Sequence, residues 1–569
     1  MFFMKEEVLR IIGTAVKGAG IKTAAVQLEY PENPEHGDFS TNIALAHAKE
    51  LKMSPKALAE KLVMELEKRL PDIVEAVEIA GPGFINFRLK NQAVAEAAIR
   101  PRVAVKRLPG KVMVEYTDPN PFKAFHIGHL MSNAIGESIS RLIEHSGSDV
   151  IRACYQGDVG LHVAKTIWSI LSNTLTKDLS FAKDFSLEKK VNVLGLAYAE
   201  GNAAYDEGHA GIKTEIEAIN KKIFDKSDKK IMDIYETGKH WSLDYFDAIY
   251  KRLGTEFKEF FFESEVGDEG LEIVNEFLKK DVFEKSDGAI VFKGEEFGLH
   301  TRVFVNSQGL PTYEAKEIGL NIEKFRKYPD LIGSLIVTGN DINEYFKVLK
   351  KVLSLIAPEV AEKTSHLSHG MMRFASGKMS SRTGNVVTAE SLIGELKEMV
   401  VDRMKGREFS AAEADEIAEQ VAIAAIKYTV LRSSVGNDII FDSVASVSFE
   451  GDSGPYLQYS AVRANSVLEK AKGMKIPEKI QLPEKVGLLE RLLVRFDDIA
   501  LRAAREYAPQ QVAGYLIELA GAFNGFYAGN TIADTAEPLS PYRIALTKAF
   551  LATMIEGLCL LGIKVPKRM

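Results

Sequence analysis

Two histidines three positions apart are the residues of this chain best suited to chemistry. The sequence PNPFKAFHIGHL, at positions 119–130, contains His126 and His129 with Gly128 between them. The apolar residues that follow recur at helical spacing as far as Gly147, which predicts an amphipathic helix beginning near His126. Residues three apart on a helix face the same way, so both imidazoles can reach one ligand. A helix N-terminus carries unpaired N–H groups and a positive dipole, which favour an anion such as phosphate.

The elements around this helix predict where its first turn lies. Residues 112–116 are typical of a strand, and residues 149–155 of a second, buried strand after the helix. A strand–helix–strand unit of this kind predicts a parallel sheet, whose ligands bind outside the carboxyl ends of the strands. The two histidines are therefore expected in such a crevice. By itself, a histidine pair at a helix start is also explained by one cap and one core residue.

A second segment, FASGKMSSRTGN at positions 374–385, changes that interpretation. It is a short stretch between Gly377 and Gly384, with Lys378 and Arg382 as cations among hydroxyl groups. Alone it fits a solvated turn equally well. Together, the two segments resemble the HIGH and KMSKS motifs of the class I aminoacyl-tRNA synthetases, and the surrounding residues resemble the arginyl members of that family. The resemblance covers nearly the whole chain outside a stretch at about 165–300.

This resemblance implies a nucleotide site made from both segments. The amino-acid carboxylate would attack the α-phosphorus of ATP and expel pyrophosphate, a reaction that needs positioning and stabilisation of charge. His126, His129 and Lys378 are the implied catalytic residues. The implied ATP-binding residues are Lys123, Gly128, His129, Lys378, Ser380 and Ser381. Mg²⁺ would arrive with the ATP and keep most of its waters, and no metal bound by the protein itself is expected.

The same resemblance implies a pocket for arginine. A guanidinium is planar and always charged, and carboxylates bind it best in a bidentate fork. The implied arginine-binding residues are Glu115, Asn120, His126, Tyr313, Glu317 and Asp341. Tyr313 and Glu317 share one face of a helix predicted from Thr312, and Asp341 follows a buried strand at 335–339. An exposed helix pair and a helix cap are the alternatives. Family members commonly carry aspartate at the position of Glu317, so either the helix is shifted or this carboxylate has a weaker role.

Composition excludes several classes of protein. A net charge of −7 on 569 residues argues against general nucleic-acid binding, so RNA contacts must come from local basic patches. Two cysteines, Cys154 and Cys559, are too few for a disulfide framework or a cysteine zinc site, which also disfavours the cysteinyl and methionyl synthetases. A reducing, cytoplasmic setting is predicted. No apolar run is long enough to span a membrane, so no membrane partner is expected.

The predicted fold class is α/β, with a Rossmann-like parallel-sheet catalytic domain between two further domains. The expected division is an N-terminal α+β domain at 1–105, the catalytic domain at 106–400 with a helical insertion at about 165–300, and an all-helical domain at 401–569. The resemblance implies that the first of these contacts tRNA and that the last binds the anticodon. In the last, Tyr456, Tyr459 and Arg463 place two aromatics and a cation where bases of a single-stranded loop can stack. Tyr456 equally fits core packing.

The function implied is an ATP-dependent ligase that makes arginyl-adenylate and moves arginine to the 3′ end of its tRNA. A monomer that binds arginine-specific tRNA, L-arginine and ATP is expected, and family members often need bound tRNA before they activate arginine. Three alternatives remain. They are another class I synthetase, a non-catalytic tRNA-binding relative, and a nucleotidyl transferase with the same core. Two complete motifs disfavour the second, and the third leaves both terminal regions unexplained.

Overall fold

A five-stranded parallel β-sheet lies at the centre of the molecule and confirms the predicted α/β fold class. The computed structural model describes residues 2–21, 26–31, 33–102, 108–173, 178–208, 210–375, 387–406, 408–474 and 477–569. The strands stand in the order β11-β10-β4-β5-β6, each pair of neighbours parallel. Their bounds are β4 Lys111–Tyr116, β5 Asp149–Gln156, β6 Glu259–Phe262, β10 Leu331–Gly339 and β11 Thr364–His369.

The strand order places a ligand crevice beside β4. The chain runs outward from β4 through β5 to β6, and later fills the other side with β10 and β11. The crevice at such a reversal point lies outside the carboxyl ends of the strands. Helix α5 (Ile127–His145) begins there, and its apolar residues Leu130, Ile139 and Leu142 are fully buried. The helix predicted from the spacing of these residues is therefore confirmed.

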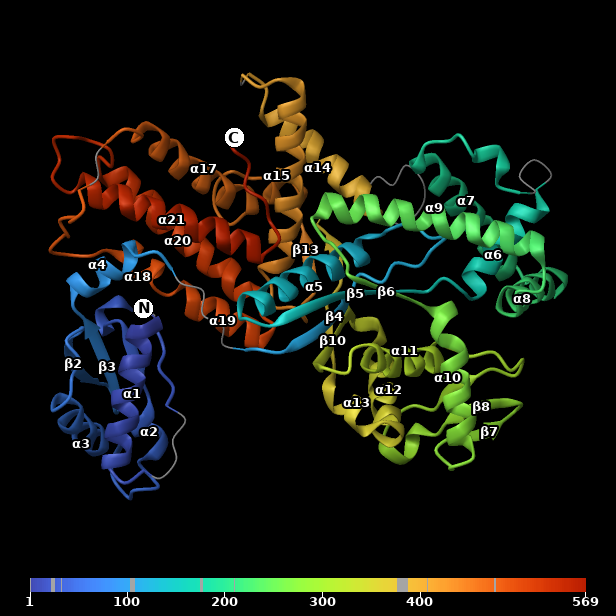
Figure 1. Cartoon of the computed structure of the whole chain (residues 1–569), viewed down its shortest axis with the longest axis horizontal. Coiled ribbons are helices and arrows are strands. Elements are labelled where there is room, and N and C mark those ends of the chain that lie inside the picture. Colours follow the sequence, from blue (N-terminus) through green and yellow to red (C-terminus); the bar gives the residue numbers. More distant parts are fainter. Residues whose placement is uncertain are drawn as a thin grey trace.

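A group of helices separates β5 from β6 (Figure 1). They are α6 Leu161–Ser172, α7 Leu187–Asp206, α8 Ala210–Asp225 and α9 Lys229–Leu253. Strand β6 lies inside the range of about 165–300 that the sequence favoured as one insertion, yet it returns to the central sheet. Its four residues, EFFF, are too few for periodicity to separate a buried strand from a helix. The chain therefore leaves the central sheet twice. It forms helices between β5 and β6, and helices with short strands between β6 and β10.

The second excursion includes the helix that carries Tyr313 and Glu317. Helix α10 (Glu263–Leu278) leaves β6 and leads to a small antiparallel sheet, in the order β7-β8-β9. Its strands are β7 Glu284–Ser286, β8 Ala289–Phe292 and β9 Arg302–Val305. Helix α11 (Tyr313–Lys327) follows and packs closely on α10. The predicted start of this helix at Thr312 is confirmed, because Thr312 is its N-cap residue.

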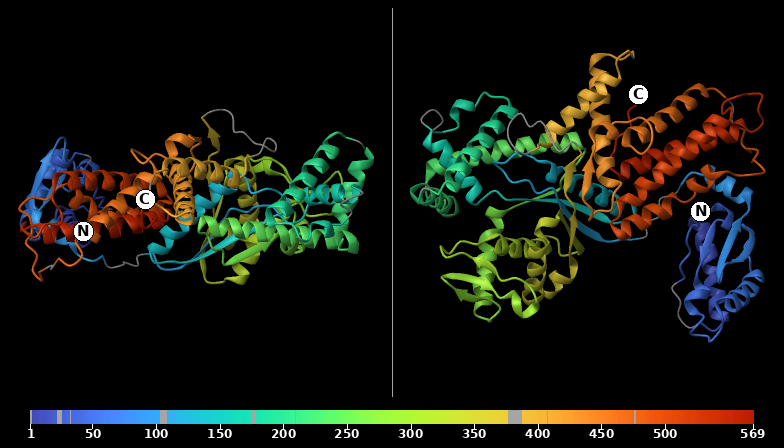
Figure 2. Two further views of the ribbon diagram at one scale, coloured as in Figure 1. Left: turned by 90° about the horizontal axis from the view of Figure 1, so that it is seen from above. Right: turned by 180° about the vertical axis from the view of Figure 1, so that it is seen from behind.

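The N-terminal region is a separate antiparallel sheet, in the order β1-β3-β2, covered by helices. Its elements are α1 Phe2–Gly18, β1 Phe39–Thr41, α2 Ile43–His47, α3 Pro55–Glu67, β2 Val74–Ala80 and β3 Phe84–Leu89. It lies beside the C-terminal helices and away from the central sheet (Figure 2). Buried Asp38 pairs with Arg491, and Lys5 lies 2.5 Å from Asp498. These ion pairs hold the region against the helical part of the chain.

The C-terminal part of the chain is mainly helical. Its longer helices are α14 Ala389–Arg403, α15 Ala411–Leu431, α17 Gly454–Lys470, α19 Phe496–Glu506, α20 Pro509–Gly529 and α21 Ser540–Leu560. Five of them, α14, α15, α19, α20 and α21, pack against helix α5 of the central domain. None of the helices in the described part of the chain is long and apolar enough to cross a membrane.

Candidate functional site

The two histidines predicted from the sequence form a reciprocal cap on helix α5. His126 is the N-cap residue, and its Nδ1 accepts a hydrogen bond of 3.1 Å from the amide of Gly128. His129 Nδ1 accepts a bond of 3.3 Å from the amide of His126. Each imidazole therefore satisfies one of the amides that a helix start leaves unpaired. The spacing of the motif is explained by this local arrangement.

The reciprocal cap also decides what the imidazoles offer to a ligand. The rings stack with centroids 3.7 Å apart. Burial and the nearby Lys123 lower the pKa of His126, and burial with the neighbouring His126 lowers the pKa of His129 well below its usual value. Both rings are therefore neutral near pH 7. Because each Nδ1 accepts a hydrogen bond, each Nε2 carries the proton, as the tautomer is set by the partner of the other nitrogen. The pair presents two N–H donors.

The residues on either side of the second segment contact helix α5 and the turn before it. The turn that carries His126 and His129 is called the histidine turn below. Ile127 donates a bond of 3.2 Å to the carbonyl of Val387, and Ala389 donates one of 2.9 Å to the carbonyl of Phe125. On the other flank, strand β12 (Met372–Phe374) contacts helix α5. One end of the second segment is therefore anchored beside the first motif, and the other end lies against helix α5. The predicted residues Lys378, Ser380 and Ser381 lie outside the described residues.

Lys123 supplies a cation near the start of helix α5. It lies in the turn after Asn120, with its ammonium 5.2 Å from the ring centroid of Tyr198. Burial and the nearby Lys165 lower the pKa of Lys123, and Glu263 opposes them. Because Lys165 disfavours the charged form of Lys123, an anion bound beside Lys123 would stabilise its charge. This favours the implied role of Lys123 toward phosphate.

A cluster of acids lies at the carboxyl end of β4 and on the facing helix α11. Glu115, at the end of β4, is 1% exposed, and its carboxylate is 2.7 Å from the ammonium of the fully buried Lys324. Glu317 accepts a bond of 3.2 Å from Asn321 and is also buried. Burial and the neighbouring Glu115 raise the pKa of Glu317 to about 8. The same two causes raise the pKa of Asp118 well above its usual value. Such a cluster is suited to a cationic ligand.

The remaining residues predicted for the arginine pocket surround this cluster. A Cβ atom added to Gly157 would lie 2.2 Å from Asn120 Oδ1 and 3.1 Å from Glu263 Oε1, so Asn120 is held against bare backbone. Tyr313, in the first turn of α11, packs edge-on against Tyr345 at 5.8 Å. Asp341 is exposed, and a Cβ on Gly339 would meet its carboxylate at 2.6 Å. The fold thus gathers these residues, with Asp341 at the rim.

Three polar residues of the pocket were missed by the sequence analysis. They are Asp118, Asn321 and Lys324. Asn321 and Lys324 lie four and seven positions after Glu317 in helix α11, on the same buried face. A polar stripe at helical spacing was therefore a detectable signal. Asp118 gave no such signal, because it lies in an irregular turn and has a positive φ of 45°.

The three residues predicted to contact RNA lie together on helix α17. Arg463 donates a bond of 2.6 Å to Asn524 Oδ1, and its guanidinium stacks 4.8 Å from the ring centroid of Tyr459. Tyr456 accepts a bond of 2.9 Å from the same Asn524. All three are partly exposed. Tyr456 thus packs against α20 and still keeps accessible surface, so its stacking with a base stays a prediction.

Metal ligation is not indicated by the geometry of the described residues. Within the described ranges, no three His, Cys, Asp or Glu side chains are arranged to hold a metal ion. Buried Asp158, in the turn after β5, instead accepts bonds from Tyr235 at 2.8 Å and Lys239 at 2.6 Å. It also accepts a bond of 2.6 Å from Ser264. This acid ties α9 and α10 to the edge of the sheet that carries the pocket.

Comparison with protein families gives three matches, which together cover most of the chain. Residues 95–443 match the model described as tRNA synthetases class I (R), catalytic domain. Residues 5–89 match the arginyl tRNA synthetase N terminal domain, and residues 457–569 match the DALR anticodon binding domain.

Named relatives are similar over nearly their full lengths. The chain is 31% identical to an arginine–tRNA ligase of Treponema pallidum, over 91% of this chain and 90% of that protein. It is 29% identical to an arginine–tRNA ligase of Porphyromonas gingivalis, over 96% and 98%. Among solved structures, the Thermus thermophilus arginyl-tRNA synthetase matches with a TM-score of 0.80 at 25% identity, over 99% of this chain and 100% of that one.

Proposed function

Because this chain belongs to the class I arginyl-tRNA synthetases, we propose that its capped histidine pair and its buried acid cluster together activate arginine with ATP. The protein is an ATP-dependent ligase that attaches arginine to tRNA. The observation that carries the assignment of the site is that two N–H donors begin helix α5, which follows β4, and that the end of β4 carries buried Glu115 beside Lys324 and Glu317 of α11. Donors suit the phosphates of ATP, and carboxylates suit a guanidinium.

We assign the phosphate end of the site to residues around the start of α5. The Nε2–H groups of His126 and His129 donate to phosphate oxygens, and the positive end of the helix adds to their effect. Gly128 lets adenosine approach the backbone, and Lys123 adds a positive charge. Lys378, Ser380 and Ser381 join from the second motif, by resemblance to the family.

We assign the arginine end to the acids and their neighbours. Glu317 is the acid best placed to pair with the guanidinium, because Glu115 already has Lys324 as its cation. Tyr313 lies one turn before Glu317 on the same face. The α-amino and carboxylate groups of the arginine substrate bind at the other end of the pocket, to Asn120, His126 and Asp341. With glutamate in place of the usual aspartate, Glu317 reaches further into the pocket by one methylene.

We further propose that tRNA binds along the helical region through Tyr456, Tyr459 and Arg463. Helix α17 presents these aromatic and cationic groups together at its surface, and the matched anticodon-binding model begins at residue 457. The division at 1–105, 106–400 and 401–569 stays a prediction. So do a monomeric state, a cytoplasmic location and the arrival of Mg²⁺ with ATP.

The reaction is tested by ATP–pyrophosphate exchange against a panel of amino acids, with and without tRNA. Arginine is expected to drive exchange, and lysine and glutamine are not. Exchange driven by lysine alone would overturn the assignment of the substrate. Absence of exchange with every amino acid, even with tRNA present, would favour a non-catalytic tRNA-binding protein instead.

Replacing Lys378 with alanine is expected to slow arginine activation by about 10²–10³-fold, the usual cost of losing one group that stabilises developing charge. The affinity for tRNA should stay within a factor of about two, since the loss is confined to the nucleotide site. Exchange kinetics and fluorescence titration with tRNA measure the two effects. Equal losses in both would mean that this segment is not catalytic.

Arginine binding is expected to strengthen as the pH rises toward about 8. With its pKa raised to about 8, the carboxyl of Glu317 is mostly protonated at pH 7 in the free protein. A guanidinium is always charged and pairs with the ionised form, so binding releases a proton. The dissociation constant should therefore fall about tenfold per pH unit below 8 and level off above it.

Calorimetry in buffers of different ionisation enthalpy counts this proton. The variant Glu317→Gln cannot titrate, so both the proton release and the pH dependence should disappear in it. Release of the same proton by Glu317→Gln would assign it to another acid with a raised pKa, such as Asp118 or Glu263.

A further inference from the structure

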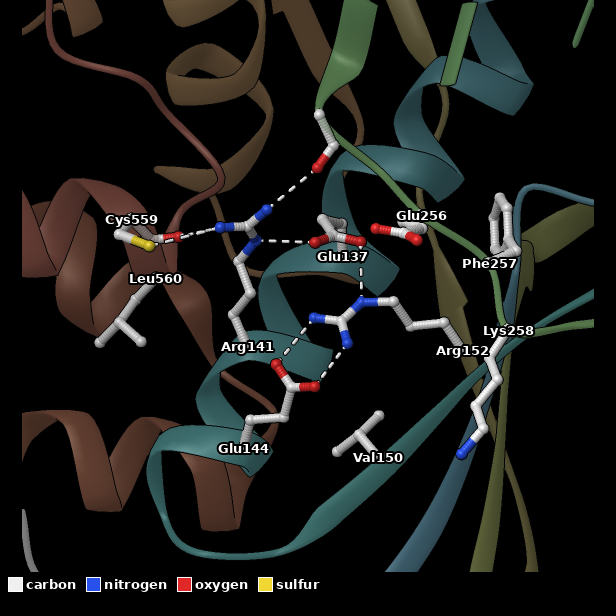
Figure 3. A pocket seen from close by; sticks show the side chains of 11 residues that line it. Glu137, Arg141, Glu144, Val150, Arg152, Glu256, Phe257, Lys258, Cys559 and Leu560 are labelled. Carbon is white, nitrogen blue, oxygen red and sulfur yellow. Dashed lines mark hydrogen bonds and ion pairs between the residues drawn. The ribbon is translucent and has the colours of Figure 1, made fainter. Parts of the chain in front are cut away.

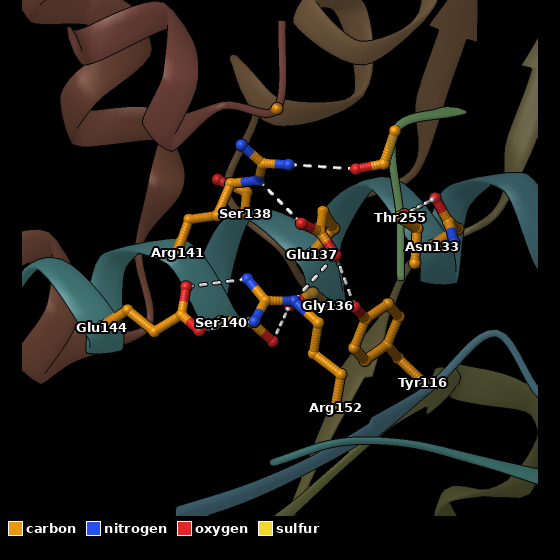
Figure 4. A network of polar contacts seen from close by, with 12 residues as sticks. Tyr116, Asn133, Gly136, Glu137, Ser138, Ser140, Arg141, Glu144, Arg152 and Thr255 are labelled. Carbon is orange, nitrogen blue, oxygen red and sulfur yellow. Dashed lines mark hydrogen bonds and ion pairs between the residues drawn. The ribbon is translucent and has the colours of Figure 1, made fainter. Parts of the chain in front are cut away.

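Helix α5 joins the histidine turn to the C-terminal helical region through a polar network centred on Glu137. This residue is 1% exposed and lies three turns after the histidines. It accepts hydrogen bonds from Tyr116 at 2.5 Å, Arg141 at 2.7 Å and Arg152 at 3.1 Å (Figure 4). Burial would raise the pKa of Glu137, but Arg152 and Arg141 outweigh it and hold that pKa below its usual value. The network is therefore charged and fully paired.

Arg141 extends this network to the end of the last helix. Its Nη1 donates to the carbonyl of Cys559 at 3.2 Å, and its Nη2 donates to the carbonyl of Gly254 at 3.0 Å (Figure 3). Ser138, one turn earlier, donates a buried bond of 2.8 Å to the carbonyl of Leu560. A planar guanidinium with its donors in a fixed fork can hold a carboxylate and two carbonyls at once. Arg141 thus fixes α5, the end of α9 and the end of α21 to one another.

A second cation bonds to the same two parts of the chain, the end of α9 and the residues around the end of α21. Lys427 of α15 is 1% exposed and donates to the carbonyls of Leu253 at 2.6 Å and Gly562 at 2.8 Å. Gly562 has a φ of 65°, and a Cβ there would lie 2.8 Å from the Lys427 ammonium. Only glycine fits this position without displacing the lysine. The chain end after α21 is therefore held at one place against α5.

The network also touches the strand that carries the arginine pocket. Tyr116, whose hydroxyl donates to Glu137, directly follows Glu115 in β4. Its ring is pressed onto α5, since a Cβ on Gly136 would lie 2.2 Å from it. An α-helix moves as a rod, and the fifteen residues from His126 to Arg141 span about 22 Å. A change in how α21 packs against α5 can therefore shift both the two histidines and the strand that carries Glu115.

We propose that Arg141 is a positioning residue, which clamps α5 to the end of α21 and thereby sets the place of the two histidines. The C-terminal helical region then acts on arginine activation through α5, besides any part it plays in binding tRNA. The effect on catalysis rests on the proposed function, while the clamp itself is a property of the free protein.

The test compares Arg141→Ala with Arg152→Ala in the full-length protein. Both variants remove one guanidinium from Glu137, but among the described residues the Arg152 side chain otherwise bonds only to Glu144 and donates to no C-terminal carbonyl. Hydrogen–deuterium exchange of the free protein reads out residues 126–133 and 559–563. Arg141→Ala is expected to raise exchange in both segments, and Arg152→Ala in neither. Faster exchange at 559–563 alone, or an equal rise at 126–133 in both variants, would overturn the proposal.

Exchange kinetics with ATP and pyrophosphate give the second readout. Misplacement of a reacting group by about 1 Å costs about 100-fold in rate, so kcat of Arg141→Ala should fall by about that factor, with a smaller change in KM for ATP. If Arg141→Ala does not fold, Ser138→Ala removes only the bond to Leu560 and should show the same pattern more weakly. If Ser138→Ala leaves both the ATP–pyrophosphate exchange kinetics and the hydrogen–deuterium exchange of residues 126–133 unchanged, the clamp is also overturned. If the wild-type protein itself shows no ATP–pyrophosphate exchange, the proposed function is refuted. The hydrogen–deuterium exchange comparison still tests the clamp in that case.

Discussion

Replacing His126 with asparagine is expected to slow arginine activation by about 10²–10³-fold while leaving the fold intact. Asparagine is a good N-cap residue, and its Oδ1 can accept the bond that His126 Nδ1 takes from the Gly128 amide. It cannot reproduce the N–H donor at Nε2. Loss of one preorganised donor to a developing charge has this magnitude of effect on kcat. The rate of ATP–pyrophosphate exchange measures it.

His126→Ala serves as the matched comparison. Alanine removes both the donor and the cap, so it should lose the same activity and also destabilise the protein by about 1 kcal/mol. The two variants should therefore differ in thermal stability, with His126→Ala less stable. Their rates of ATP–pyrophosphate exchange should be equally low. Near-normal activity in His126→Asn would mean that the imidazole acts only as a cap.

Replacing Lys324 with methionine is expected to give the largest loss of stability among single changes in the site. Lys324 is fully buried and lies 2.7 Å from Glu115, in a cluster that also contains Asp118 and Glu317. Without the ammonium, the Glu115 carboxylate would be buried unpaired among other acids. Breaking a buried pair from one side typically costs about 3–5 kcal/mol. Chemical denaturation followed by a probe in the catalytic domain measures this loss.

The double variant Glu115→Gln with Lys324→Met provides the control. It removes both charges, and replacing a whole buried pair is often nearly neutral, so most of the lost stability should return. A double variant as unstable as Lys324→Met alone would contradict the pairing. Arginine affinity in the stable double variant then separates a direct role of Glu115 from support given through Lys324.

Much of the local structure of the site could be predicted from the sequence. The apolar spacing after His129 defined α5, and the buried runs before and after it defined β4 and β5. The histidine spacing predicted a shared face because one helical turn relates the two residues. These signals are local, and local backbone preferences decide them.

The partners of the acids could not be predicted in the same way. Glu115 and Lys324 are far apart in the chain, and they meet because β10 lies beside β4 and brings α11 with it. Strand β6 looked like part of a long insertion because its four residues, EFFF, are too few to show a period. Its place in the sheet depends on pairing with β5.

The sequence by itself determined the two motifs, the elements that carry them and the class of reaction. Only the tertiary structure decided that Lys324 pairs with Glu115, which imidazole nitrogens carry protons, and that Arg141 joins α5 to the end of α21 at Cys559. The reason is physical. Periodicity and spacing act within one element, whereas charge, burial and hydrogen-bond partners depend on which elements become neighbours when the chain folds.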